Sequence, residues 1–384
     1  MTFSFATATR VVFGPGSARK VAKLAAGHGR RAFVVTGSAA ARVQFLPDDL
    51  AREGLEVESF RAVGEPSIER VEAGVAQLRA ASSEVVIAIG GGSAIDTGKA
   101  IAALASNEGA ALSYLEVIGE GRALTAPPLP LLALPTTAGT GAEVTKNAVL
   151  ASAVHRVKVS LRSDAMLPQA AVVDPELTVS VPPDITAATG MDALTQLLEP
   201  FVSHQANPLT DAFCRAGLGR VSWALRRVYA GGDDLEAREA MALASLLGGL
   251  ALANAKLGAV HGFAGPIGGR SGAPHGAICA ALVPPTTAAN VAALHTLDPH
   301  HPALKRYNEA AQLLTGSPVA VAADGVTWLA DLARDLGIPP LSAYGIRPDN
   351  LPELAKQSAR SSSMRGNPVE LSHDTLVGIL EAAL

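Results

Sequence analysis

The chain has 384 residues, of which 48% are hydrophobic and 17% are charged, a composition typical of a globular protein large enough for two domains. Its formal net charge of −4 argues against binding to nucleic acid or to an anionic membrane surface. The two cysteines, Cys214 and Cys279, form no disulfide framework, and because both stand in apolar runs we expect them to be buried and reduced.

Neither the N-terminal segment nor the apolar runs indicate a membrane protein. The first ten residues, MTFSFATATR, lack a basic region followed by an apolar core, so we expect no signal peptide. The longest uncharged apolar run, at 241–255, is short and glycine-rich for a membrane span, and we predict a buried helix there. The expected location is therefore the cytoplasm.

In the first half of the chain, short apolar runs alternate with helical stretches. The helical stretches lie at 16–26 and 67–81, where apolar residues recur at helical spacing. This alternation is typical of a parallel sheet covered on both faces, whose ligands bind beyond the carboxyl ends of the strands. The predicted strands are 30–37, 54–60, 84–92, 129–137 and 170–178.

The pattern changes near residue 182. From there to the end, long Ala- and Leu-rich helical segments are broken only by Gly and Pro. The sequence therefore predicts two domains: an α/β domain over 1–183 with a parallel, Rossmann-like sheet, and an all-α domain over 184–384.

Three glycines separate the third predicted strand from a helix. Because Gly91 and Gly92 carry no Cβ, a phosphate group could approach the backbone and meet the first amides of the helix. Ser93 and Asp96 also match the S-x-x-D pattern of a capping box, so a tight turn before a capped helix explains the same residues. The loop is not G-x-G-x-x-G, and a standard dinucleotide fingerprint is absent.

A second loop of this kind, LPTTAGTGAEVT at 134–145, follows the fourth predicted strand. It carries Thr136, Thr137 and Thr140, whose small hydroxyl groups suit hydrogen bonding to the sugar and phosphates of a nucleotide. Two such loops on one sheet are hard to explain as purely structural. We therefore predict a nucleotide site that includes residues of both loops: Gly91, Gly92, Ser93, Asp96, Thr136, Thr137 and Thr140.

Four residues of the second half form a candidate metal site. Asp192 and Gln196 are four residues apart and would share one face of a helix, while His261 and His275 stand in glycine-rich, nearly uncharged surroundings. One aspartate and two histidines are a plausible set for Zn²⁺ or Fe²⁺, and Gln196 would add a weak neutral oxygen. The same histidines could instead be core residues bonded to backbone carbonyls, since a spacing of 14 residues is no standard metal motif.

Taken together, five segments resemble the iron-containing alcohol dehydrogenase family, in the order of the family and over nearly the whole chain. The resemblance implies that an N-terminal α/β domain binds NAD(P) and that a helical domain holds a divalent metal. The metal would polarise an alcohol or carbonyl oxygen while hydride passes to or from the nicotinamide. The segments are GGGSAIDTGKA (90–100), the second loop (134–145), VVDPELT (172–178), GMDALTQLLEPFVSHQANPLTDAF (190–213) and VHGFAGPIGGRSGAPHGAICA (260–280).

The resemblance carries the metal ligands onto Asp192, Gln196, His261 and His275, with iron or zinc as the metal. The family usually has histidine where this chain has Gln196, and Gly265 replaces a further family histidine near the substrate and nicotinamide. Glutamine is a poorer donor than imidazole to such metals, so we expect binding weaker than is usual in the family. A metal-independent reductase is the alternative that these substitutions leave open.

The resemblance also bears on the cofactor. NAD-preferring members commonly carry an aspartate where Gly37 stands, and a carboxylate there would repel a 2′-phosphate. Glycine therefore favours NADP(H) over NAD(H), with Ser38 placed to donate to the phosphate. Lys158 matches a family lysine close to the cofactor, although its spacing alone favours a solvated lysine at a strand edge.

The expected substrate is an aldehyde or ketone bulkier than ethanol, or the corresponding alcohol, because Gly265 leaves room where the family has an imidazole. A homodimer is the family expectation. Three rival functions are weighed: a maleylacetate reductase, a dehydroquinate synthase-like lyase on a similar scaffold, and a non-catalytic nucleotide-binding relative. The second loop argues against the first, and the lyase needs several cations near its phosphate where only Lys256 and Arg270 are present.

Overall fold

The computed structural model forms two compact units. The α/β unit comprises Phe5–Thr137 and Gly141–Ser180, and the helical unit comprises chiefly Val181–Leu384, with the short segment Ala138–Thr140. The domain boundary predicted at 183 and 184 lies close to this division. The structure describes residues 2–38, 40–155 and 157–384.

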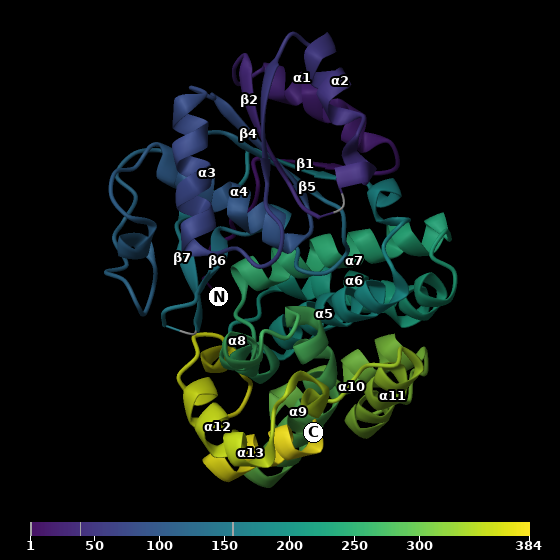
Figure 1. Cartoon of the computed structure of the whole chain (residues 1–384). Helices are drawn as coiled ribbons and strands as arrows, with labels where there is room; N and C mark the ends of the chain where they lie inside the picture. Colours follow the sequence, from purple (N-terminus) through teal and green to yellow (C-terminus); the bar gives the residue numbers. More distant parts are fainter. Residues whose placement is uncertain (1, 39, 156) are drawn as a thin grey trace. The chain divides into compact units, whose positions relative to one another are not determined.

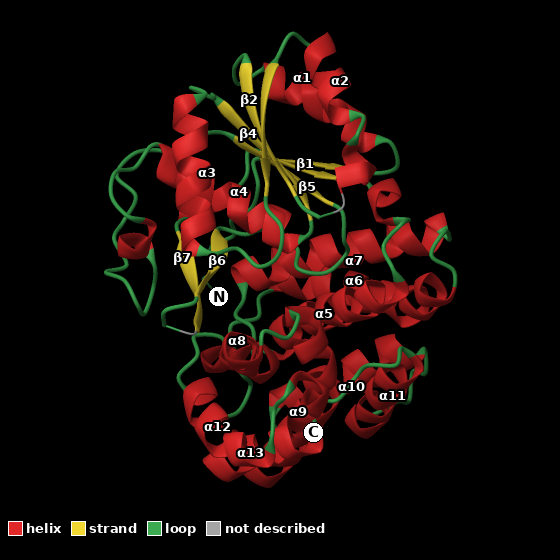
Figure 2. Cartoon of the chain, in the orientation of Figure 1, coloured by secondary structure: helices red, strands yellow, loops and turns green. Residues whose placement is uncertain are grey.

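A six-stranded parallel sheet is the centre of the α/β unit (Figure 2). Its strand order is β1-β8-β5-β4-β2-β3, and each pair of neighbours is parallel. The predicted fold class, a parallel α/β sheet followed by a helical region, is confirmed. The strands are Arg10–Phe13 (β1), Arg31–Thr36 (β2), Glu56–Arg61 (β3), Val85–Gly90 (β4), Leu131–Pro135 (β5) and Ala170–Val173 (β8).

The strands β4 and β5 are apolar and buried at every position because both faces of the sheet are covered. In β4, Ile87 and Ile89 pack in one core with α1 and α2, while Val86 and Ala88 pack in a second core with α3 and α4. Figure 1 shows these two helix pairs on opposite faces of the sheet. The helices are Val21–Ala26 (α1), Leu46–Arg52 (α2), Ile68–Ala80 (α3) and Gly92–Ala105 (α4).

Three strands lie outside the predicted ones. They are β1 and the antiparallel hairpin formed by β6 (Asn147–Ser152) and β7 (Val157–Arg162). The strand β1 is short and partly exposed, and β6 alternates buried with half-buried residues. Neither is a fully buried apolar run, and such runs are the pattern on which the strand predictions rest.

The predicted strand 170–178 is longer than the strand in the structure. It ends at Val173, and Pro175–Thr178 form a 3₁₀ turn instead. Pro175 cannot donate to a ladder, and the carboxylate of Asp174 accepts a hydrogen bond from the amide of Glu176 at 3.0 Å. A side-chain cap thus ends this strand.

The helical unit is built around α5, which is buried on every side from residue 190 to residue 202. Small residues allow its neighbours to approach: a Cβ added at Gly217 of α6 would lie 2.4 Å from a methyl group of Leu197. One apolar core runs through the unit. Its helices are Pro183–Val202 (α5), Pro208–Ala230 (α6), Leu235–Asn254 (α7), Ala259–Ser271 (α8), His275–Leu297 (α9), Pro302–Thr315 (α10), Ala322–Asp335 (α11), Leu351–Ala359 (α12) and His373–Ala382 (α13).

One helix of this unit, α9, is long and apolar enough to cross a membrane by length and composition alone. Of its apolar window, 61% is buried inside the protein, as expected for a core helix. The predicted buried helix at 241–255 is confirmed for most of its length, since it falls in α7, which packs in the same core.

Buried charges join α4 to the β6–β7 hairpin. Lys99, whose residue exposure is 1%, donates to the hydroxyl of Thr145 at 2.7 Å and to the carbonyl of Asn147 at 2.9 Å. Its Nζ lies 3.7 Å from the carboxylate of Asp96, which accepts a hydrogen bond from Val149. Burial raises the pKa of the nearby Glu143 to about 7, and the charge of Lys99 only partly opposes this.

This cluster predicts a pH-dependent stability. The pKa of Glu143 is higher in the folded chain than in the unfolded chain. The contribution of Glu143 to the free energy of unfolding is therefore fully present below the unfolded pKa near 4.5 and is lost as pH rises through the folded pKa of about 7. Glu143→Gln removes this loss, so the variant should nearly match the wild type at pH 4 and exceed its stability by about 3 kcal/mol at pH 8. Urea unfolding at both pH values measures the difference. Glu53→Gln, at an exposed position, is the control and should change neither value.

Candidate nucleotide and metal sites

The residues of the predicted nucleotide site follow three neighbouring strands. Gly37 follows β2, Gly91 follows β4, and Thr136 and Thr137 stand at the end of β5 or directly after it. These strands are adjacent in the sheet and parallel, so their carboxyl ends lie at one edge. The chain runs from β2 to β3 on one side and then to β4 on the other, which makes this edge a topological switch point, where such sheets bind ligands.

The glycine loop leaves the start of α4 uncapped. A Cβ added at Gly90 would lie 2.6 Å from the Cβ of Ala94, so tight packing requires this glycine. The helix begins after Gly91, and no side-chain hydrogen bond caps it within the described chain. The predicted capping box of Ser93 and Asp96 is therefore wrong, because Ser93 already lies inside the helix. The first amides of α4 are left for an anionic group.

The other predicted cofactor residues lie on different parts of the chain. Ser38 is exposed beyond β2. Lys158, on β7, is only 10% exposed, and its Nζ lies 3.2 Å from the carboxylate of Glu65. It is thus an ion-paired lysine rather than a solvated one. Thr140 belongs to the short segment that packs with the helical unit.

Three helices of the helical unit bring the metal candidates together. Asp192 lies on α5, His261 on α8 and His275 at the start of α9. One ligand atom of each, together with Sγ of Cys279, lies within 4.8 Å of all the others. Asp192 Oδ1 is 3.3 Å from His261 Nε2 and 3.7 Å from His275 Nε2. Gly276 permits this convergence, because a Cβ there would lie 2.5 Å from the carbonyl oxygen of Ala188 on α5.

Several polar atoms of this cluster lack a hydrogen-bond partner. In the described chain, Oδ1 of Asp192, Oε1 of Gln196 and Nε2 of His261 are all buried without one. Buried polar atoms in proteins are nearly always satisfied, and a divalent cation would satisfy a carboxylate oxygen and an imidazole nitrogen together. The donor set therefore fits a divalent metal. Gln196 follows Asp192 by one turn of α5, as predicted.

Glu199 orients one of the histidines and was not expected from the sequence. Its carboxylate accepts a hydrogen bond from His261 Nδ1 at 2.6 Å and from the amide of Val260 at 2.7 Å. With Nδ1 engaged in this way, Nε2 faces Asp192, which is how metal-binding histidines are usually held. The available signal is its spacing: Glu199 follows Asp192 by seven residues, two turns along the same helix.

The charges of the cluster support one another. Burial alone raises the pKa of Asp192, but attraction to His275 and His261 and the Gln196 amide outweigh burial and hold that pKa below its ordinary value. Burial alone lowers the pKa of His261, but Cys279, Glu199 and Asp192 outweigh it and raise that pKa well above its ordinary value. The carboxylate and the imidazoles thus each favour the charged form of the other.

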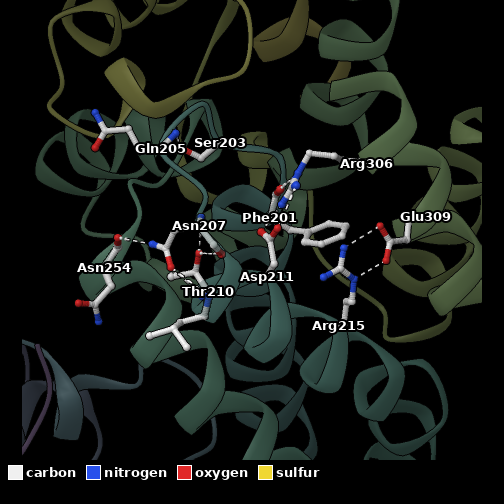
Figure 3. A network of polar contacts seen from close by, with 11 residues as sticks. Phe201, Ser203, Gln205, Asn207, Thr210, Asp211, Arg215, Asn254, Arg306 and Glu309 are labelled. Atoms are coloured by element: carbon white, nitrogen blue, oxygen red, sulfur yellow. Dashed lines mark hydrogen bonds and ion pairs between the residues drawn. The ribbon is translucent and has the colours of Figure 1, made fainter. Parts of the chain in front are cut away.

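A separate polar network fixes the carboxyl end of α5 (Figure 3). Arg306 of α10 donates to the carbonyl of Phe201, stacks over its ring at 4.5 Å and pairs with both carboxylate oxygens of Asp211. Asn207 caps α6 through a reciprocal pair of hydrogen bonds with Thr210. The helix that carries Asp192 is thus anchored at its carboxyl end.

Comparison with known proteins identifies the family. The model of iron-containing alcohol dehydrogenase matches residues 8–175, and that of the C-terminal part of the Fe-containing alcohol dehydrogenase family matches residues 186–384. The chain is 35% identical to the 1,3-propanediol dehydrogenase of Klebsiella pneumoniae over 341 residues, which cover 87% of the chain and 85% of that relative. It is 31% identical to the NAD-dependent methanol dehydrogenase of Bacillus methanolicus over 384 residues, 97% of each.

Comparison with solved structures supports the same family. The crystal structure of a 1,3-propanediol oxidoreductase aligns with the whole of this chain, and over its own whole length, with a TM-score of 0.92 and 32% sequence identity. The sequence motifs, the two family models and the fold agree, and the chain therefore belongs to the iron-containing alcohol dehydrogenase family.

Proposed function

We propose that this protein reduces an aldehyde or ketone with NADPH, and oxidises the corresponding alcohol in reverse, with a divalent metal held by Asp192, His261 and His275. As a family member it is an oxidoreductase that acts on alcohols and carbonyl compounds. The observation that supports a metal is the cluster of ligand atoms from three helices. Two of these atoms, Oδ1 of Asp192 and Nε2 of His261, are buried without a hydrogen-bond partner in the described chain. Zinc and iron both suit these donors.

The metal, when bound, would act as a Lewis acid that polarises the substrate oxygen. The protein supplies its donors in a fixed arrangement: Asp192 is 1% exposed and buried in the unit, and Glu199 holds the ring of His261. The side chain of His275 is 40% exposed, so the cluster is accessible to a small molecule from that side. A Cβ at Gly265 would meet nothing within 4 Å, which supports room for a substrate larger than ethanol.

The nucleotide is assigned to the switch-point edge of the α/β unit, with its pyrophosphate at the amides that begin α4. Gly37 supports NADPH over NADH, because no carboxylate at this position repels a 2′-phosphate. The exposed Ser38 beside it offers a hydroxyl donor. A homodimer and a cytoplasmic location remain predictions from the family resemblance and from the sequence.

The metal is tested by removal. The purified protein should oxidise NADPH in the presence of medium-chain or aromatic aldehydes, lose this activity to a chelator and regain it with Zn²⁺ or Fe²⁺. Turnover that is unaffected by chelator, in protein free of metal, would instead establish a metal-independent reductase. If no aldehyde, ketone or alcohol supports turnover with either nicotinamide, the non-catalytic alternative holds.

The cofactor preference is tested at Gly37. A Cβ there would lie 3.6 Å from the Cβ of Ala94, an ordinary contact, so Gly37→Asp should fold. The new carboxylate should raise the ratio of kcat/KM for NADH to that for NADPH at least tenfold, about 1.4 kcal/mol. Gly37→Ala is the matched control, since it adds bulk without charge and should leave the ratio nearly unchanged. An unchanged ratio in the aspartate variant would refute the assignment.

The orienting role of Glu199 is tested by Glu199→Gln. The amide can accept from either His261 or Val260 but presents an N–H group to the other, so the imidazole loses its fixed orientation. We expect the affinity for Zn²⁺ to fall about 10–100-fold, measured by competition with a chelating dye. The exposed Glu370→Gln serves as control. Equal affinities in the two variants would show that Glu199 does not orient a ligand.

A further inference from the structure

The cluster contains a thiol as well as the predicted ligands, and we propose that Cys279 is a metal ligand that takes the place left by the change to Gln196. This inference rests on the proposed metal site. Cys279 follows His275 by four residues on α9, so the two side chains lie on one face of that helix. Its Sγ is 3.7 Å from Nε2 of His275, and the residue is fully buried.

The separations between the donor atoms match the dimensions of a metal site. Metal–ligand bonds of about 2.0–2.3 Å place the donors of a tetrahedral ion roughly 3.3–3.8 Å apart. The three separations measured here are 3.3 Å from Asp192 to His261, 3.7 Å from Asp192 to His275 and 3.7 Å from His275 to Cys279. The thiol meets one of these distances, to His275, and its Sγ also lies within 4.8 Å of the ligand atoms of Asp192 and His261.

Gln196 is the less suitable donor for the same position. Its oxygen is neutral, whereas a thiolate brings a negative charge to a buried divalent ion. Gln196 Oε1 is nevertheless buried without a hydrogen-bond partner in the described chain, so the affinity comparison below tests this oxygen directly against the thiol. The second cysteine, Cys214, lies on α6 in the apolar core and offers an internal control.

The ligand set has a chemical consequence for metal choice. Binding converts the thiol of Cys279 to a metal-bound thiolate and releases its proton to solvent. One thiolate, two imidazoles and one carboxylate form a softer set than the carboxylate and three imidazoles implied by the family resemblance. Softer sets favour Zn²⁺ over Fe²⁺. We therefore infer that this family member prefers zinc, with Gln196 as a hydrogen-bonding neighbour of the site.

The test is spectroscopic and independent of activity. Apoprotein is loaded with one equivalent of Co²⁺, and the near-ultraviolet region is examined for sulfur-to-cobalt charge transfer. The wild type, Cys214→Ala and Gln196→Ala should show the band, and Cys279→Ala should lack it. X-ray absorption of the zinc-loaded wild type should show one sulfur at about 2.3 Å. Wild-type spectra with nitrogen and oxygen donors alone would overturn the proposal, even if Cys279→Ala fails to fold.

Zinc affinity separates the two candidate donors. Cys279→Ala should bind Zn²⁺ at least about 100-fold more weakly than wild type, a larger loss than for changes beyond the ligands. Gln196→Ala should lose less than tenfold, and the reverse order would assign the position to Gln196. Metal content is measured on the same samples. A wild type that binds no metal refutes the proposed site itself, whereas metal held without sulfur refutes only the role of Cys279.

Discussion

A carboxylate buried inside a helical core sets the constraint on which the functional site depends. Asp192 is 1% exposed on a helix that is enclosed by apolar side chains, and an unpaired charge at such a place is strongly unfavourable. Two imidazoles, one from α8 and one from α9, lie beside this carboxylate and stabilise its charge. The same arrangement that stabilises the charge without a metal supplies the donors that a metal needs.

The surrounding structure serves this convergence. Gly276 permits α9 to begin against the backbone of α5, and Glu199 fixes the ring of His261. Asn367 extends the support, because its side chain accepts from the amide of Ala259 at the start of α8 and bonds reciprocally with Asn290 of α9. Helix starts and side-chain orientations are thus set by polar contacts, while the apolar core sets only the packing of the helices.

The departures from the family pattern are concentrated around this site. Gln196 and Gly265 stand where the resemblance implies histidines, and Cys279 lies among the remaining donors. An exchange of one ligand for another on a different helix keeps the number of donors and changes their chemistry. Such an exchange leaves the fold unchanged, as the close structural match to a 1,3-propanediol oxidoreductase shows. The proposed exchange would alter the metal preference, and Gly265 would enlarge the room beside the substrate.

The α/β unit meets a similar constraint by different means. Lys99 is buried two turns into α4, where the hydroxyl of Thr145, the carbonyl of Asn147 and the carboxylate of Asp96 satisfy its charge. This polar cluster ties α4, whose first amides are assigned to the nucleotide, to the β6–β7 hairpin. Asp96, read from the sequence as a helix cap, belongs to this cluster and not to the helix end.

The sequence by itself determined the layout of the chain. Periodicity and composition were sufficient for the parallel sheet, for the helical second half and for the position of the glycine loop, because these follow from local patterns of apolar residues. The half-buried strands β6 and β7 were missed because neither is a continuous buried apolar run. The side-chain cap at Asp174 was missed because the apolar run before it reads as a longer strand.

Only the tertiary structure decided which side chains meet. Asp192, His261 and His275 follow from the sequence and its family resemblance. Cys279 is buried, as predicted, but its place among the donor atoms and the contact of Glu199 with His261 do not follow from the sequence. The contacts of both side chains depend on tertiary packing. A cysteine in an apolar run has the same local sequence whether its sulfur faces a leucine or a histidine. These contacts form when α5, α8 and α9 pack together. They join residues of α5 to residues of α8 and α9 that are 62 or more positions away in the sequence, which no local pattern can predict.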